Sequence, residues 1–219
     1  MTPEHQALRA ALPSPATVPA LRRLARGWVA ARKASPAAIL TTMDSLFAGD
    51  VHNEKILAAL IVGYSRPARR ATTPARLSAW LDTVVGWDEV DALCANAFQA
   101  EDFLSHWPLW SAALRRLAAD ANIHKRRASL VLLTGPVRRS DDPRLAELAF
   151  NTIAALQGER PILITKAASW LLRNLIARHR EAVVAYVDAH RAALPAIAVR
   201  ETTNKLHTGR KTPRKTPRP

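Results

Sequence analysis

The 219-residue chain carries 32 lysines and arginines against 18 aspartates and glutamates, a formal net charge of +14 at pH 7. This surplus favours a polyanionic partner, and the five basic residues among the last twelve account for only part of it, because +9 remains without them. The single cysteine excludes an intramolecular disulfide. Seven glycines in an alanine- and leucine-rich chain indicate an all-helical protein.

Prolines and capping residues predict where the helices begin. Residues 1–18 contain several prolines and favour a loosely ordered lead-in with one short helix near residues 4–12. Beyond it, apolar residues recur at helical spacing after each start signal. Asn53, Asp102 and Asn122 are candidate caps. We expect a basic turn at residues 63–70 and the end of a helix at residues 134–136. The expected helices cover residues 19–33, 35–47, 53–62, 73–85, 87–98, 102–118, 123–133, 141–156, 161–177, 179–193 and 195–206.

The regular spacing of these helices indicates a repeat architecture. Helices start roughly every 15 to 20 residues, and antiparallel pairs of about 35 to 45 residues are typical of HEAT-like repeats. We therefore expect an all-α protein in which residues 19–207 form a HEAT-like helical-repeat solenoid with a concave basic groove. The basic composition of residues 208–219 predicts a disordered tail, which either attracts phosphates or only aids solubility.

Trp87 and Asp91 lie one helical turn apart, so their side chains share a face. Val90 and Leu93 form a core-directed stripe about a quarter-turn away, which puts Asp91 at the edge of an apolar surface beside an indole. The helix dipole alone favours acidic residues in a first turn, and tryptophans near helix starts usually pack. Two interpretations therefore stand, a structural helix start or a functional carboxylate beside an aromatic ring.

A second tryptophan stands off the apolar stripe of its helix. Trp170 lies on the side that also carries Lys166 and Arg173, opposite the stripe that includes Leu171 and Leu175. The indole either packs on a neighbouring terminal helix or faces a ligand.

Adjacent arginines show the inverse pattern. Arg127 shares a face with the apolar residues Leu130 and Val131, next to Arg126. Its aliphatic stem can cover the core while the charge reaches water. Alternatively, a rigid helix holds the guanidinium against a phosphate, which its planar geometry suits.

Three stretches, in this order, resemble the AlkD-type DNA alkylation-repair family: WDEVD at residues 87–91, RRASL at 126–130 and KAASWLLR at 166–173. The later stretch VRE at residues 199–201, before a final helix, is similar as well. The resemblance covers most of the chain, from about residue 35 to residue 206. It implies HEAT-like repeats and a DNA glycosylase for cationic N3- or N7-alkylated purines in double-stranded DNA.

The resemblance also implies roles for individual residues. On the family pattern, Asp91 is the catalytic carboxylate, and Trp87 and Trp170 are the paired aromatics at the lesion. The expected DNA-binding residues are Arg127, with Arg126 as the competing assignment, Arg173 and Lys166.

Four positions depart from the family pattern and bear on substrate range and rate. Gly86 stands where a second aromatic residue is frequent, Ser169 replaces a common glycine, Asn174 a common glutamate, and His124 a frequent aromatic.

The chemistry fits a site without a cofactor. Alkylation at N3 or N7 makes a purine cationic, so its glycosidic bond is already weakened, and a carboxylate stabilises the positive sugar that forms. The histidines show no metal-ligand spacing. We expect a monomer that needs neither cofactor nor metal and that is cytoplasmic and associated with the nucleoid. We expect neither a signal peptide nor a membrane span.

Two other functions remain open. One is a non-catalytic helical-repeat protein that binds distorted or branched DNA through the same basic groove. The other is a protein scaffold in which Trp170 is a hot spot for a partner.

Overall fold

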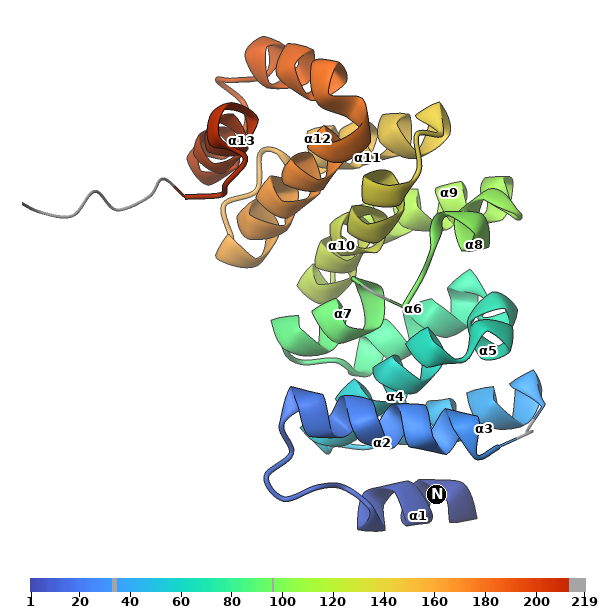
Figure 1. The fold of residues 1–219 in the computed structure, drawn as a ribbon. Coiled ribbons are helices and arrows are strands. Elements are labelled where there is room, and N and C mark those ends of the chain that lie inside the picture. Colours follow the sequence, from blue (N-terminus) through green and yellow to red (C-terminus); the bar gives the residue numbers. More distant parts are fainter. Residues whose placement is uncertain (33–34, 96, 213–219) are drawn as a thin grey trace, which may run out of the picture. The chain divides into compact units, whose positions relative to one another are not determined.

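The computed structural model describes residues 1–32, 35–95 and 97–212. Within these residues the chain is built of helices and contains no strand, which confirms the all-helical prediction. The chain divides into two compact units, Met1–Ala113 and Leu114–Pro219 (Figure 1).

The first unit contains short and medium-length helices joined by brief connections. They are α1 (Pro3–Ala10), α2 (Val18–Ala30), α3 (Pro36–Phe47), α4 (His52–Tyr64), α5 (Arg66–Ala71), α6 (Pro74–Thr83), α7 (Trp87–Cys94) and α8 (Ala100–Leu104). Helix α9 (Trp107–Ala118) follows and runs through the boundary between the units in sequence.

Hydroxyl side chains followed by proline begin most of these helices. Thr2, Thr17, Ser35 and Thr73 each accept a hydrogen bond from a backbone N–H of the following turn, and each of these helices has proline at one of its first two positions. Such a cap contributes about 1 kcal/mol, and the fixed φ of proline suits a first turn. The predicted helix starts near residues 35 and 73 are confirmed.

Helix α4 is the centre of the first unit. It packs against α2, α3 and α7, and most of its residues are buried. Its apolar side chains Ile56, Leu57 and Ile61 lie in the core. Through this packing, α4 is the support on which α7 rests.

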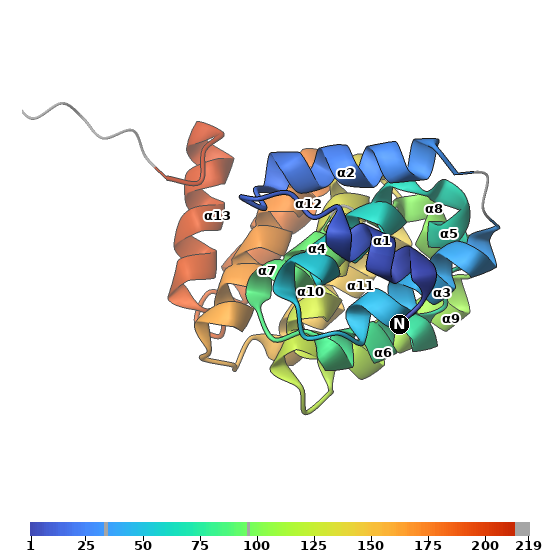
Figure 2. The ribbon, with the colours of Figure 1, turned by 90° about the horizontal axis from the view of Figure 1, so that it is seen from below.

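Residues 1–18 contain the expected short helix, α1, and buried side chains anchor it. The helix lies against α3 (Figure 2). The His5 imidazole lies 2.8 Å from the Ser45 hydroxyl and 3.1 Å from a Glu54 carboxylate oxygen. Arg9 donates to both oxygens of the same carboxylate, which is fully buried. Helix α1 thus supplies the partners that a buried charge requires.

The second unit contains the end of α9 and four further helices, α10 (Ile123–Arg139), α11 (Pro143–Leu156), α12 (Ile162–Ala189) and α13 (Ala196–Thr208). Helix α10 packs against α11 and α12, and α12 packs against α13. Asn122 caps α10, as the sequence predicts, and Asp142 caps α11. Gly209, with a φ of +71°, ends α13 in the left-handed conformation that glycine adopts at low cost.

Several predicted boundaries are wrong. The N-cap of α4 is Val51 and not Asn53. The expected basic turn at residues 63–70 is instead the last turn of α4 followed by α5, which Ser65 caps. Asp102 is the third residue of α8, where it completes a capping box with Gln99 and is not the cap itself.

The largest boundary error lies in α10. The helix continues through Thr134, Gly135 and Pro136 to Arg139, although these residues usually end a helix. All three are buried, so tertiary packing offsets the lost backbone hydrogen bond. A kink at His179 inside α12 corresponds to the predicted start of a separate helix. The predicted helix end at Lys33 lies outside the described residues.

Candidate functional site

Trp87 and Asp91 lie on the side of α7 that is turned away from the core. The Trp87 side chain is 58% exposed, and Asp91 is partly exposed. Val90 and Leu93, the predicted core stripe about a quarter-turn away, are fully buried. The helix therefore presents an indole and a carboxylate one turn apart on a rigidly packed element.

The turn between α6 and α7 is held by a carboxylate that the sequence analysis missed. Glu89 is only 1% exposed, and it accepts a hydrogen bond from the Val85 N–H at 2.8 Å. Its other oxygen lies 2.8 Å from His52 Nδ1. Glu89 looked like an acidic residue favoured by the helix dipole, and only its spacing of four residues from Val85 could have suggested a cap.

His52 lies between two carboxylates of α7. Its Nδ1 faces Glu89, and its Nε2 lies 3.2 Å from Asp88 Oδ2. Gly86, the N-cap of α7, leaves room for this arrangement, because a Cβ there would come within 2.5 Å of Asp88 Oδ1. The departure from the family pattern at Gly86 thus has a local steric consequence.

Helix α12 carries Lys166, Trp170 and Arg173, and the structure shows all three at least partly off the core. Lys166 is exposed, Trp170 is half-buried, and 15% of the Arg173 side chain is exposed. The predicted apolar stripe on the other side, including Leu171 and Leu175, is fully buried.

Arg173 belongs to a polar cluster with Ser169, Glu201 and Lys211. Ser169 Oγ donates to Glu201 Oε2 at 2.5 Å and accepts from Arg173 Nε at 3.3 Å. Lys211 Nζ lies 3.2 Å from the other Glu201 oxygen. Lys211 therefore has a fixed contact although it falls in the predicted disordered tail, whose residues 213–219 lie outside the described part.

The charges of this cluster affect one another. Burial disfavours ionisation of Glu201, but the Ser169 hydrogen bond and the charges of Lys211 and Arg173 together hold its pKa below the usual value. Burial lowers the pKa of Arg173. Burial and the positive charges of Arg173 and Arg138 lower the pKa of Lys205. Arg138 on α10 and Arg173 on α12 thus both repel the charge of Lys205 on α13.

Arg126 is bound by groups of its own unit. Its Nε and Nη2 donate to the Glu159 carboxylate at 2.7 and 3.3 Å. Its Nη1 donates to the carbonyl oxygens of Asp120 and Ala121 at 2.8 and 2.7 Å. These bonds join the start of α10 to the segment before α12.

Arg127 is only 5% exposed, and its Nη1 donates to the Leu163 carbonyl oxygen at 2.6 Å. The guanidinium therefore contacts the first turn of α12. Arg127 therefore lacks the exposed, solvent-directed head of a snorkelling side chain.

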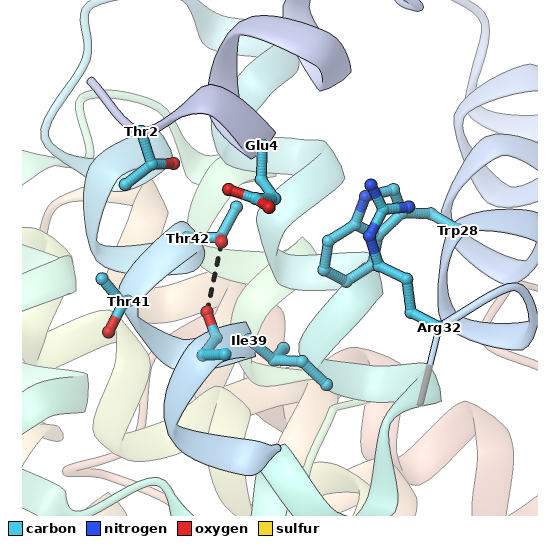
Figure 3. A pocket seen from close by; sticks show the side chains of 8 residues that line it. Thr2, Glu4, Trp28, Arg32, Ile39, Thr41 and Thr42 are labelled. Atoms are coloured by element: carbon cyan, nitrogen blue, oxygen red, sulfur yellow. Dashed lines mark hydrogen bonds between the residues drawn. The ribbon is translucent and has the colours of Figure 1, made fainter. Parts of the chain in front are cut away.

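A surface pocket of about 260 Å³ in the first unit is formed by other residues (Figure 3). The Arg32 guanidinium lies over the Trp28 ring, 4.5 Å from its centroid. None of the predicted site residues lines this pocket. Its lining residues are Thr2, Glu4, Trp28, Arg32, Ala38, Ile39, Thr41 and Thr42.

Among residues 1–32, 35–95 and 97–212, the described part of the chain, no three histidine, cysteine, aspartate or glutamate side chains converge as metal ligands would. Nor does any helix in it combine the length and apolar character needed to cross a membrane.

Comparison with known proteins bears on the whole arrangement. The model of one protein family, described as DNA alkylation repair enzyme, matches residues 16–206. No curated protein matches the chain. The matched region includes both tryptophans, Asp91 and all the predicted DNA-binding arginines. Because the match covers most of the sequence, the chain belongs to the DNA alkylation repair enzyme family.

Proposed function

We propose that the protein is a DNA glycosylase that hydrolyses the N-glycosidic bond of cationic N3- or N7-alkylated purines in double-stranded DNA. The observation that carries this proposal is the exposed face of α7, where Trp87 and Asp91 stand one turn apart. Membership of a DNA alkylation repair family supports a damaged-DNA substrate. In this proposal the helices form HEAT-like repeats with a basic groove for the duplex, and the protein acts as a monomer.

Asp91 acts on the sugar and not on the leaving base. An alkylated purine leaves without prior protonation, because it already carries a positive charge. Positive charge then develops on the deoxyribose, and a fixed carboxylate nearby stabilises it more than mobile water does. Asp91 also orients the water whose oxygen bonds to C1′. The departing base takes the electron pair of the glycosidic bond and leaves neutral, and the bound water releases one proton to the solvent.

The tryptophans provide faces that attract cations. An indole beside a cationic base or an oxocarbenium-like sugar contributes about 0.5–2 kcal/mol. Trp87 is exposed enough to offer such a face, and Trp170 is partly exposed on α12. We assign both to contacts with the damaged nucleotide.

Positive side chains on α12 bind the phosphates beside the lesion. Lys166 and Arg173 are the direct contacts in this proposal, because they lie on the Trp170 side of the helix. Arg126 and Arg127 act indirectly, by holding the starts of α10 and α12 in place. Their guanidinium groups already donate to Glu159 and to backbone carbonyls.

A comparison of lesions tests this function. Duplexes that carry a single N7-methylguanine, N3-methyladenine or O6-methylguanine are incubated with excess protein, and free base is measured by chromatography. We expect release of the two cationic bases and none of neutral O6-methylguanine, because the mechanism has no general acid for a neutral leaving group. Equal release of all three would contradict the mechanism.

The same three duplexes also test the competing function, a non-catalytic DNA-binding protein. The cations Arg138, Arg173 and Lys205 would serve a non-catalytic DNA-binding protein equally well. Tight binding to all three duplexes without any base release would establish that alternative and overturn the glycosylase.

A further inference from the structure

Two side chains of α4 hold the turn that precedes α7. Lys55 Nζ donates to the Thr83 carbonyl oxygen at the end of α6. One helical turn earlier, His52 contacts Glu89, whose carboxylate accepts from the Val85 N–H. Residues three apart share a helix face, so a single face of α4 fixes the turn at both ends.

The cost of this arrangement suggests more than a stable turn. A buried carboxylate is unfavourable unless it is paired and hydrogen-bonded. The groups that satisfy Glu89 belong to a half-exposed histidine and to the backbone of Val85, whose side chain is 77% exposed. A buried carboxylate is thus used to fix a short turn in which Val84 is buried and Val85 is exposed.

The turn leads directly into the predicted site. Trp87 lies two residues after Val85 and is the first residue of α7, and Asp91 lies one turn further along. Trp87 is 58% exposed, so the backbone at residues 85–87 has a large part in setting where its indole points. Asp88 adds a second link, because its Oδ1 accepts from the Glu89 N–H while its Oδ2 faces His52.

We propose that Glu89 and His52 are positioning residues, which hold the turn before α7 so that Trp87 and the start of the Asp91 helix are preformed for the damaged nucleotide. This inference rests on the proposed function. Neither residue touches the substrate in this account, and each acts through the position of Trp87.

The test compares two buried carboxylates of the first unit. Glu89→Gln and His52→Phe weaken the turn. Glu54→Gln is the matched control, since Glu54 is equally buried and also contacts a histidine, but it anchors α1. Three quantities are measured for each protein: the single-turnover rate constant of N7-methylguanine release, the Kd for the same duplex, and the Tm.

We expect Glu89→Gln and His52→Phe to slow base release by about tenfold or more, because small displacements of catalytic groups have effects of this size. Their Kd should change by less than about threefold, since the phosphate contacts are retained. Glu54→Gln should lower the Tm and leave the rate constant within about twofold of wild type. If Glu54→Gln slows release as much as Glu89→Gln, or if His52→Phe keeps the wild-type rate, the positioning role is wrong.

A readout independent of catalysis separates this inference from the proposed function. In protein labelled with fluorotryptophan, the Trp87 fluorine resonance is assigned from its loss in Trp87→Phe. We expect that resonance to shift or broaden in Glu89→Gln and His52→Phe and to stay unchanged in Glu54→Gln. If wild type releases no base, the glycosylase proposal fails, while this resonance still decides whether the two residues position Trp87. An unchanged resonance in both turn variants would overturn the inference.

Discussion

Arg126 and Arg173 each lie beside a carboxylate, yet their surroundings differ. Arg126 uses three nitrogen atoms on Glu159 and on two backbone carbonyls, so its donors are committed within the protein. Arg173 has one hydrogen bond, to Ser169, and lies 3.5 Å from Glu201. At this scale the two arginines should respond differently to substitution.

We expect Arg126→Gln to lower the free energy of unfolding by about 1–3 kcal/mol, because it leaves a carboxylate and two carbonyl oxygens without their donor. Arg173→Gln should instead weaken DNA binding with a smaller loss of stability. Urea denaturation followed by circular dichroism and titration with a fluorescent duplex measure both effects. If Arg126→Gln keeps its stability and loses DNA affinity, it is a phosphate contact, as one reading of the family pattern holds.

Single residues also show where sequence reasoning reached its limit. The positions of Trp87, Asp91 and Trp170 off the core followed from helical periodicity, because the apolar stripe of each helix was unambiguous. Glu89 was missed since its burial depends on His52, which lies 37 residues away. Likewise, the pairing of Arg126 with Glu159 spans 33 residues and leaves no periodic signal.

Among the elements, α1 depends on one buried charge. Burial raises the pKa of Glu54, and the hydrogen bonds from Arg9 and His5 lower it. The net result is a pKa below the usual value. A carboxyl with a depressed pKa in the folded state stabilises the protein above its ordinary pKa. That contribution is lost as the pH falls through this value toward the folded pKa.

We therefore expect the wild-type protein to lose stability between about pH 6 and pH 3 more steeply than Glu54→Gln. The variant should be less stable at neutral pH, because a glutamine cannot form the charged pair with Arg9. Urea denaturation at a series of pH values provides the comparison, and the effect of Glu201 cancels because both proteins retain it. Parallel stability curves for the two proteins would show that Glu54 contributes nothing through its charge.

Helix starts were easier to predict than helix ends. Starts at residues 36, 74, 123 and 143 follow a capping side chain next to the helix, which is a local signal. The end of α10 was misplaced because Gly135 and Pro136 are local breakers that burial overrides. The docking of α1 escaped prediction for a similar reason, since its anchor, Glu54, lies in another helix.

At the scale of the whole molecule, the main electrostatic feature is the net charge of +14. Arg138, Arg173 and Lys205 come from three helices of the second unit. Burial, together with repulsion by Arg173 and Arg138, lowers the pKa of Lys205. A phosphate would relieve this repulsion. Counterions released on such binding make the affinity for DNA depend on salt.

We expect Lys205→Gln to reduce the slope of log K against log salt concentration by about 0.9, the value for one phosphate contact on duplex DNA. Arg191→Gln is a control with the same change of charge, because Arg191 already pairs with Asp188 on the surface. Fluorescence anisotropy at several salt concentrations gives both slopes. Equal slopes for Lys205→Gln and wild type would remove Lys205 from the interface.

The role of Asp91 is the central claim, and one measurement tests it most directly. Single-turnover release of N7-methylguanine is compared for wild type, Asp91→Asn and Asp50→Asn, a surface substitution with the same change of charge. The affinity for the alkylated duplex is followed in parallel. The account predicts release by wild type and Asp50→Asn, and loss of release by Asp91→Asn with DNA binding retained. Release by Asp91→Asn at the wild-type rate would contradict it.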